Sequence, residues 1–319
     1  MSEQEWRSKS SNLKVKTAWL YHVEKMTQEQ IADHLQISRV KVMRTLAECV
    51  TEGIVVTTIN SAASEQIAAE RALEKRWNLS SAVVIPSPSN DKNLEKAIGH
   101  AIARYLSMEM GDGKTLAIGG GATLFSSLQF LEKRKLKDAS VIGLVGSLPH
   151  SGWINPSIVA ARVAEAFDID SYQITAPVVV DSPKLAKALW AQPPLMEVKQ
   201  RTANADIALL TVGEITPDAT IFRHGIVGSD LIPSLVAKGA VANVLCYFID
   251  AQGNLVDHEL NSRIMAVDLA TVCKIPRIVL AAGGAAKVKA ILAALHLMPT
   301  GVLVTDMLTA QALLDHDGP

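Results

Sequence analysis

The sequence is poor in cysteine, in aromatic residues and in net charge. Its three cysteines, Cys49, Cys246 and Cys273, are far apart and outside any Cys-x-x-Cys pattern, so we expect reduced core residues of a cytoplasmic protein. Aromatic residues make up only 4% while aliphatic residues dominate, which predicts a large buried core and excludes a disordered chain. The net charge of −1 excludes bulk affinity for polyanions. Any contact with nucleic acid must therefore be local.

Segments that would carry the chain into or across a membrane are also missing. The first ten residues contain no apolar signal segment, and no apolar run approaches the roughly 20 residues that span a bilayer. We therefore expect a soluble protein with no membrane partner. Its 319 residues are enough for two domains, one of them much larger than the other.

Recognisable catalytic machinery is scarce. The eight histidines are scattered, with no pair at the spacing of a metal site, and no Gly-x-Ser-x-Gly elbow occurs. The densest acid and base cluster, residues 257–259, follows a Gly-Asn turn and is expected to be a solvated loop. The sequence therefore indicates a binding protein rather than an enzyme, with no metal and no cofactor.

The N-terminal region has the pattern of two short helices joined by a tight turn. Thr27 and Gln30 have the spacing of a capping box at the start of the first helix. Residues 36–37 would make the turn, Ser38 would cap the second helix, and Gly53 stands where a left-handed residue ends a helix. This pattern is typical of a helix-turn-helix, although two amphipathic helices also occur in ordinary helical subdomains.

The second helix has an apolar face and a basic face. Its inward side is expected to be Val42 or Met43 together with Leu46, Ala47 and Val50. Three basic residues would then point outward, where they could reach phosphates or guanine edges in the major groove. No acid lies among residues 36–47, so the basic footprint is a stripe. The predicted DNA-contacting residues are Thr27, Gln28, Ser38, Arg39, Lys41, Val42 and Arg44.

Two further elements complete the N-terminal region. Residues 54–59 are β-branched and predict a strand that forms a wing beside the two helices, which a helix at residues 13–24 would support. Residues 64–77 predict a helix that could link two domains or pair with its copy in a dimer. We predict a DNA-binding domain at 1–60, a linker helix at 61–80 and a ligand-binding domain at 81–319.

From residue 82 onward, short apolar runs alternate with helical patterns. This alternation predicts a doubly wound α/β domain, in which a parallel sheet is covered on both faces and binds ligands at the carboxyl ends of its strands. The predicted strands are 82–85, 115–118, 140–145, 173–180, 206–212, 277–282 and 301–305, and the clearest predicted helices are 94–110, 156–167 and 285–297.

Two glycine loops follow predicted strands and are candidates for ligand binding. In the first, three glycines let the backbone N–H groups approach an anion, and a helix begins near Thr123. In the second, Gly283 and Gly284 precede a helix with Lys287 in its first turn, and Asn243 could hydrogen-bond a hydroxyl or carbonyl. Neither loop has the spacing of a dinucleotide fingerprint or a Walker motif, and glycines also make tight turns. The predicted effector-binding residues are Gly119, Gly120, Gly121, Ala122, Thr123, Asn243 and Lys287.

Several blocks, in their order and spacing, resemble the SorC family of bacterial sugar-responsive transcriptional regulators. The resemblance spans nearly the whole chain and is carried by residues 27–46, 53–55, 116–123, 239–253, 281–287 and 303–306. It implies a winged helix-turn-helix joined to an effector domain similar to sugar-phosphate isomerases, without retained catalysis. It further implies operator DNA and a phosphorylated sugar or polyol as partners, and a homotetramer built as a dimer of dimers.

The chain departs from the family pattern at the block that contains Asn243. The family often has Gly-Asp where this chain has Ala242-Asn243, and Gly-Arg where it has Cys246-Tyr247. An acid only accepts hydrogen bonds, whereas an amide also donates, so a different hydroxyl pattern in the ligand is expected. Residues 145–152 contain no lysine, which argues against a Schiff base with an aldehyde sugar. The alternative is a sugar-phosphate isomerase or deaminase fused to a helical oligomerisation module.

Overall fold

The computed structural model describes residues 3–56, 64–90, 93–148, 155–298 and 301–316. The chain divides into two compact units, Met1–Ala62 and Ala63–Pro319, and each is described by itself. Across the described residues, no helix is both long and apolar enough to cross a membrane.

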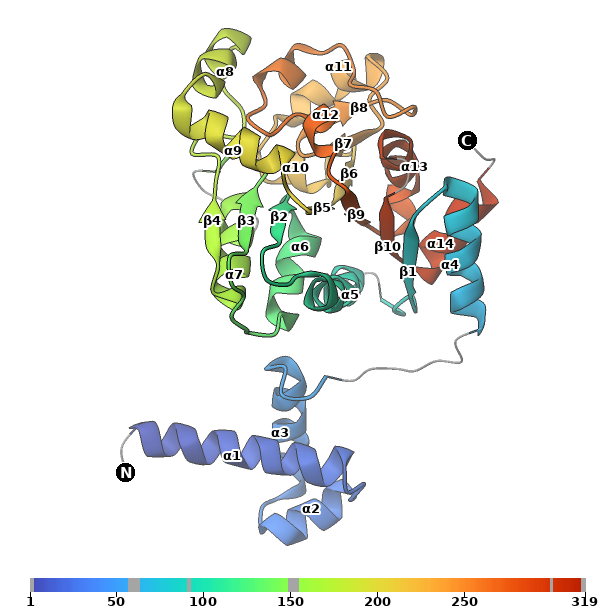
Figure 1. Cartoon of the computed structure of the whole chain (residues 1–319). Coiled ribbons are helices and arrows are strands. Elements are labelled where there is room, and N and C mark those ends of the chain that lie inside the picture. The colour runs from blue at the N-terminus through green and yellow to red at the C-terminus, as the bar shows by residue number, and fades with distance from the viewer. Residues whose placement is uncertain (1–2, 57–63, 91–92, 149–154, 299–300, 317–319) are drawn as a thin grey trace. The chain divides into compact units, whose positions relative to one another are not determined.

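The first unit consists of the helices α1 (Glu3–His22), α2 (Gln28–Leu35) and α3 (Arg39–Thr51) (Figure 1). The capping box at Thr27 is present, since the Thr27 N–H donates to Gln30 Oε1 at 2.9 Å and the Gln30 N–H donates to Thr27 Oγ1 at 3.3 Å. Gln36 turns the chain in the left-handed region (φ 51°), and the Ser38 hydroxyl caps α3. The expected pair of helices and its turn are thus confirmed.

The face that α3 turns inward differs from the expected one. Val42, Thr45, Leu46 and Cys49 are buried, while Met43 and Val50 are each 53% exposed and Ala47 is also exposed. Positions 42, 45, 46 and 49 share one side of a helix with 3.6 residues per turn. Because Thr45 is polar, the pattern of apolar residues in the sequence did not identify this side as the buried one. The assignment of Val42 to DNA contact was therefore wrong: with an exposed fraction of 0%, it packs in the core with Leu20, Ile31, Ala32 and Leu46.

The predicted wing is not seen as a strand where the structure describes it. Residues 54–56 have no regular structure, and residues 57–59 lie outside the described residues. The helix expected at 64–77 is present as α4 (Ser64–Trp77). It belongs to the second unit, where it packs on β1 (Ser81–Ile85) and α14 (Met307–Asp315) and buries Leu73 and Trp77.

The second unit is built on a parallel sheet of seven strands in the order β1-β10-β9-β5-β2-β3-β4 (Figure 1). All neighbouring strands pair in parallel. The further strands of this sheet are β2 (Thr115–Ile118), β3 (Ser140–Gly143), β4 (Asp170–Tyr172), β5 (Ile207–Leu210), β9 (Arg277–Ala281) and β10 (Val302–Asp306).

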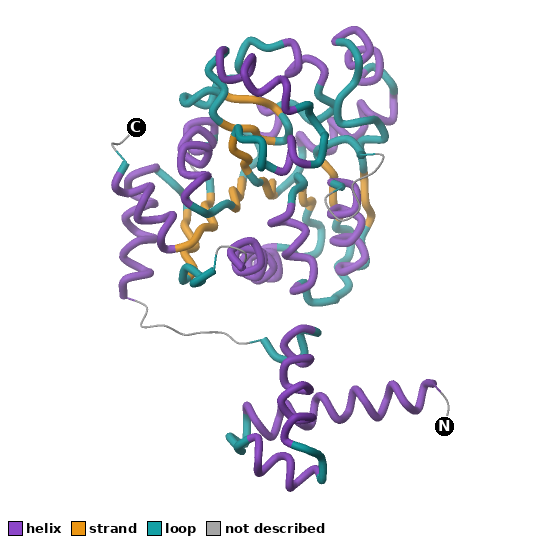
Figure 2. Tube along the Cα trace, turned by 180° about the vertical axis from the view of Figure 1, so that it is seen from behind, coloured by secondary structure: helices purple, strands orange, loops and turns teal. Residues whose placement is uncertain are grey.

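Helices cover both faces of this sheet, as Figure 2 shows. The central strands are apolar after their first residues, and successive residues alternate between two cores: Leu116 and Ile118 of β2 enter one, and Ala117 enters the other. The first core is closed by α5 (Leu94–Glu109), α6 (Ala122–Ser127) and α7 (Pro156–Phe167), and the second by α4, α9 (Pro193–Ala203), α13 (Val288–Leu297) and α14. The predicted mixed α/β architecture with a parallel sheet is confirmed.

A small antiparallel sheet packs beside the large one. It contains β6 (Val212–Glu214), β7 (Ala242–Val244) and β8 (Tyr247–Ile249) in that order. The β7–β8 turn consists of Leu245 (φ 51°) and Cys246 (φ 67°). Two consecutive positive φ angles define a type I′ hairpin, a turn that normally carries Asn-Gly. No glycine marks it here, so the sequence did not reveal this hairpin.

One predicted strand was wrong. Residues 173–180 form no strand, and only isolated bridges join Ser147 to Pro177 and Val179 to Ile264. Pro177 lacks the N–H that a ladder requires, and β4 lies just before this segment. The remaining short helices are α8 (Pro183–Trp190), α10 (Thr220–Arg223), α11 (Ile232–Ala237) and α12 (Leu269–Val272), with 3-10 turns at Leu128–Phe130, Ser229–Leu231, Glu259–Arg263 and Ala285–Lys287.

Candidate functional site

A cavity of about 260 Å³ lies at the carboxyl ends of β2 and β5. From β2 the chain runs through β3 and β4 towards one edge of the sheet, whereas β5, β9 and β10 lie on the other side of β2. The strand order thus reverses between β2 and β5, and open α/β sheets bind ligands at this point. The cavity is lined by all seven residues predicted for effector binding, Gly119, Gly120, Gly121, Ala122, Thr123, Asn243 and Lys287.

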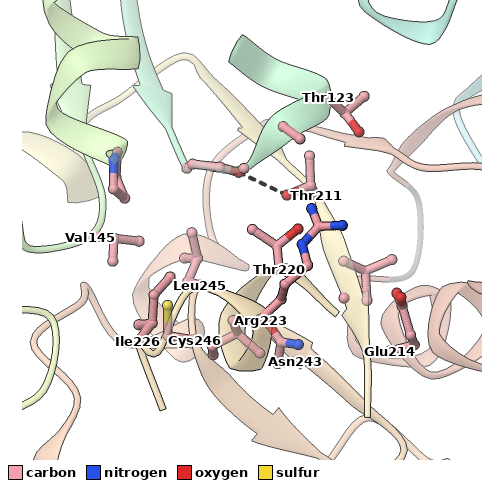
Figure 3. A pocket seen from close by; sticks show the side chains of 18 of the residues that line it. Thr123, Val145, Thr211, Glu214, Thr220, Arg223, Ile226, Asn243, Leu245 and Cys246 are labelled. Carbon is pink, nitrogen blue, oxygen red and sulfur yellow. Dashed lines mark hydrogen bonds between the residues drawn. The ribbon is translucent and has the colours of Figure 1, made fainter. Parts of the chain in front are cut away.

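The glycine loop after β2 is held in one conformation by contacts that exclude side chains. The Thr211 hydroxyl donates to the Gly120 carbonyl at 2.9 Å (Figure 3). A Cβ on Gly120 would lie 2.7 Å from Pro156 Cγ, and Gly121 has φ 109°. Within the described parts of the chain, the N–H groups of Gly120 and Gly121 have no acceptor. These donors suit an anionic group of a ligand.

Two buried polar atoms of the cavity lack partners. Glu214 Oε2 and Asn243 Nδ2 are shielded from solvent, and neither has a hydrogen bond to any residue that the structure describes. Both residues line the cavity, and a Cβ on Gly213 would lie only 2.5 Å from Asn243 Nδ2. Because leaving a buried donor or acceptor unpaired costs about 1–3 kcal/mol, a bound ligand is expected to pair them.

The polar side of the cavity has residues that the sequence did not single out. Arg223 points into the cavity towards Thr211 and Thr220, and the carboxylates of Glu214 and Asp218 also line it. These side chains follow β5 in the segment 211–223. The rule that ligands bind at the carboxyl ends of parallel strands could have drawn attention to this segment, because 206–212 was a predicted strand.

The opposite side of the cavity is apolar. Val145, Leu245, Ile226 and the thiol of Cys246 gather there in Figure 3. Burial raises the pKa of the Cys246 thiol to about 12, so this group stays protonated and is not a nucleophile near neutral pH. Across the described residues, no group of three His, Cys, Asp or Glu side chains is arranged to hold a metal.

The residues predicted for DNA contact lie at the start of α2 and on the first half of α3, and all except Val42 reach the surface. Thr27, Ser38, Arg39, Lys41 and Arg44 are exposed, and Gln28 is half-buried. Thr27, Gln28 and Arg39 also border an open groove together with Tyr21 and Lys25. The first turns of α3 and its N-cap thus expose three cations and the hydroxyl of Ser38, and the N-cap of α2 exposes the hydroxyl of Thr27.

Comparisons with known proteins agree on one family. Residues 61–315 match the protein family described as "Putative sugar-binding domain". The chain is 31% identical over 310 residues to the transcriptional regulator LsrR of Klebsiella pneumoniae, which covers 95% of this chain and 92% of that protein. It is 28% identical over 305 residues to the erythritol catabolism regulatory protein EryD of Brucella abortus, covering 95% and 96%.

A solved structure shows the same fold over nearly the whole chain. The full-length sorbitol operon regulator SorC from Klebsiella pneumoniae aligns with a TM-score of 0.73 and 25% identity, covering 95% of this chain and 99% of that one. These three relatives are all named as regulators. The chain therefore belongs to the SorC family of sugar-binding transcriptional regulators.

Proposed function

We propose that this regulator controls a carbohydrate-utilisation operon by binding operator DNA through α2 and α3 and a phosphorylated sugar or polyol in the cavity of the second unit. One observation supports the effector site above all. The same cavity is lined by a glycine loop with unbonded N–H groups and by the unpartnered buried atoms of Glu214 and Asn243. The loop and Arg223 bind the phosphate, and Asn243 binds a hydroxyl or carbonyl oxygen. The protein binds without catalysing turnover.

The DNA-binding role is supported by the exposed start of α3. We propose that the first unit is a helix-turn-helix domain in which Arg39, Lys41 and Arg44 reach phosphates and base edges of the major groove. Operators with two-fold symmetry require at least a dimer, and we propose a homotetramer assembled as a dimer of dimers. Such a protein acts in the cytoplasm, where its operator is.

Effector binding should change operator affinity. A thermal-shift screen of sugars, polyols and their phosphates would identify compounds that stabilise the protein, because a ligand that binds only the folded state raises its melting temperature. A compound identified in this way should then alter operator affinity by about 5-fold to 150-fold in fluorescence anisotropy. Turnover of a sugar phosphate by the pure protein, with no effect on sequence-specific DNA binding, would contradict the proposal.

Substitution of the basic residues of α3 should separate the two binding activities. Lys41→Ala or Arg44→Ala should lower operator affinity about tenfold or more, the effect of losing one good contact, and reduce its salt dependence. Affinity for the sugar ligand, measured by calorimetry, should not change. Lys75→Ala is the matched control, because Lys75 is an exposed lysine of α4 in the second unit. Equal loss of DNA and ligand binding in the α3 variants would argue against two separate binding units.

A further inference from the structure

The two sides of the cavity differ in what they can accept from a ligand. On one side lie the glycine loop, Thr220 and Arg223, all of which can donate hydrogen bonds to a phosphate, while the Thr211 hydroxyl donates to the Gly120 carbonyl (Figure 3). On the other lie the apolar side chains of Val145, Leu245 and Ile226 with the protonated Cys246 thiol. An anionic group on this second side would lose its hydration without gaining a partner. Among the described lining residues, the donors for an anionic group therefore lie on one side of the cavity.

The charges that line the cavity lead to the same conclusion. Among the described residues that line it, the cationic side chains are Arg223 and Lys287, and the carboxylates are Glu95, Glu214 and Asp218. One phosphate monoester carries about −1.5 to −2 charges at neutral pH, and pairing with it would occupy both Arg223 and Lys287. A second phosphate would find no further cation among these lining residues and would stand near carboxylates instead.

Glu214 is the carboxylate best placed to discriminate between ligands. Its Oε2 is buried and has no partner among the described residues. A carboxylate only accepts hydrogen bonds, so it can bind a ligand hydroxyl, which donates. A phosphate oxygen also only accepts and carries the same sign of charge, so it is repelled there. Asn243, whose unpartnered Nδ2 donates, complements Glu214 by binding a ligand oxygen.

From these features we infer that the effector is a sugar or polyol with a single phosphate, and that Glu214 is the residue that rejects bisphosphates. This inference rests on the proposed effector site and specifies its ligand class. The phosphate binds at the glycine loop and Arg223, a hydroxyl donates to Glu214, and the uncharged end of the ligand lies against Leu245 and Cys246.

Matched pairs of ligands test this inference on the full-length protein. The probes are fructose 6-phosphate with fructose 1,6-bisphosphate, glucose 6-phosphate with glucose 1,6-bisphosphate, and ribulose 5-phosphate with ribulose 1,5-bisphosphate, together with unphosphorylated sugars and polyols. For each monophosphate that binds in calorimetry, the bisphosphate should bind about tenfold more weakly or worse. Glu214→Gln keeps the shape of the side chain and removes its charge, so this ratio should fall to about threefold or less.

A control variant and four possible outcomes make the test decisive. Glu165→Gln, on the exposed side of α7 beside Arg162, should keep the wild-type ratio. Bisphosphates that bind as well as monophosphates, or a ratio that Glu214→Gln leaves unchanged, would overturn the inference while the effector site stands. Binding of unphosphorylated sugars or polyols alone would do the same. If no sugar, polyol or phosphate binds at all, the proposed effector site fails, and the inference fails with it.

Discussion

Val42→Asp should unfold the N-terminal unit and abolish operator binding. Val42 is completely buried among Leu20, Ile31, Ala32 and Leu46, and this small core holds three helices together. A carboxylate placed there has no partner, and burying it costs several kcal/mol, on the order of the whole stability of a unit this small. Circular dichroism should show the loss of one melting transition, while ligand binding by the second unit persists.

The matched control is Val40→Asp, the same substitution two residues earlier on α3. Val40 is 54% exposed, so its replacement should change the melting temperature little. Only thermal stability is compared in this control, because Val40 lies among the residues proposed to face DNA. Equal melting behaviour of the two variants would contradict the assignment of Val42 to the core and restore it as a candidate for DNA contact.

Gly121→Ala should weaken ligand binding by about tenfold to a hundredfold. Gly121 has φ 109° and ψ 164°, a conformation that residues with a side chain adopt only at a cost of roughly 1–3 kcal/mol. The added Cβ would also lie 3.2 Å from Thr211 Oγ1, the hydroxyl that holds the Gly120 carbonyl. The loop must therefore shift, and its N–H groups with it. Calorimetry with a ligand identified by the thermal-shift screen measures the effect.

A second glycine provides the control for this substitution. A Cβ on Gly111 would meet nothing within 4 Å, and its φ is outside the left-handed region. Gly111→Ala should therefore leave ligand affinity unchanged. If Gly121→Ala also binds the ligand with wild-type affinity, the loop does not contact the ligand, and the phosphate must bind elsewhere.

The strands and helices of the second unit could largely be predicted, because burial on both faces makes strands apolar in a way that the sequence shows directly. Thus 115–118 and 156–167 agree with β2 and α7. The predicted effector residues also meet at one cavity, because the carboxyl ends of parallel strands share one edge of the sheet.

The remaining features depend on contacts between distant residues. The inward face of α3 includes Thr45, whose burial next to α1 and α2 cannot be read from polarity. Arg223 and Glu214 belong to the cavity only because α10 and β6 follow directly after β5 at the strand reversal. No local pattern in the segment 211–223 shows this. The turn at Leu245 and Cys246 lacks the glycine that would have identified it.

This turn brings two side chains into the lining of the cavity. Leu245 and Cys246 adopt backbone angles that glycine would adopt without cost, and their side chains fill the end of the cavity, with Leu245 Cδ2 3.1 Å from the Cβ position of Gly119. Glycine at these positions would relieve the backbone angles but would also remove side chains that pack in the core, where Leu245 is almost completely buried. The two residues of this hairpin therefore shape the cavity and stabilise the core at the same time, so a substitution here is expected to change both.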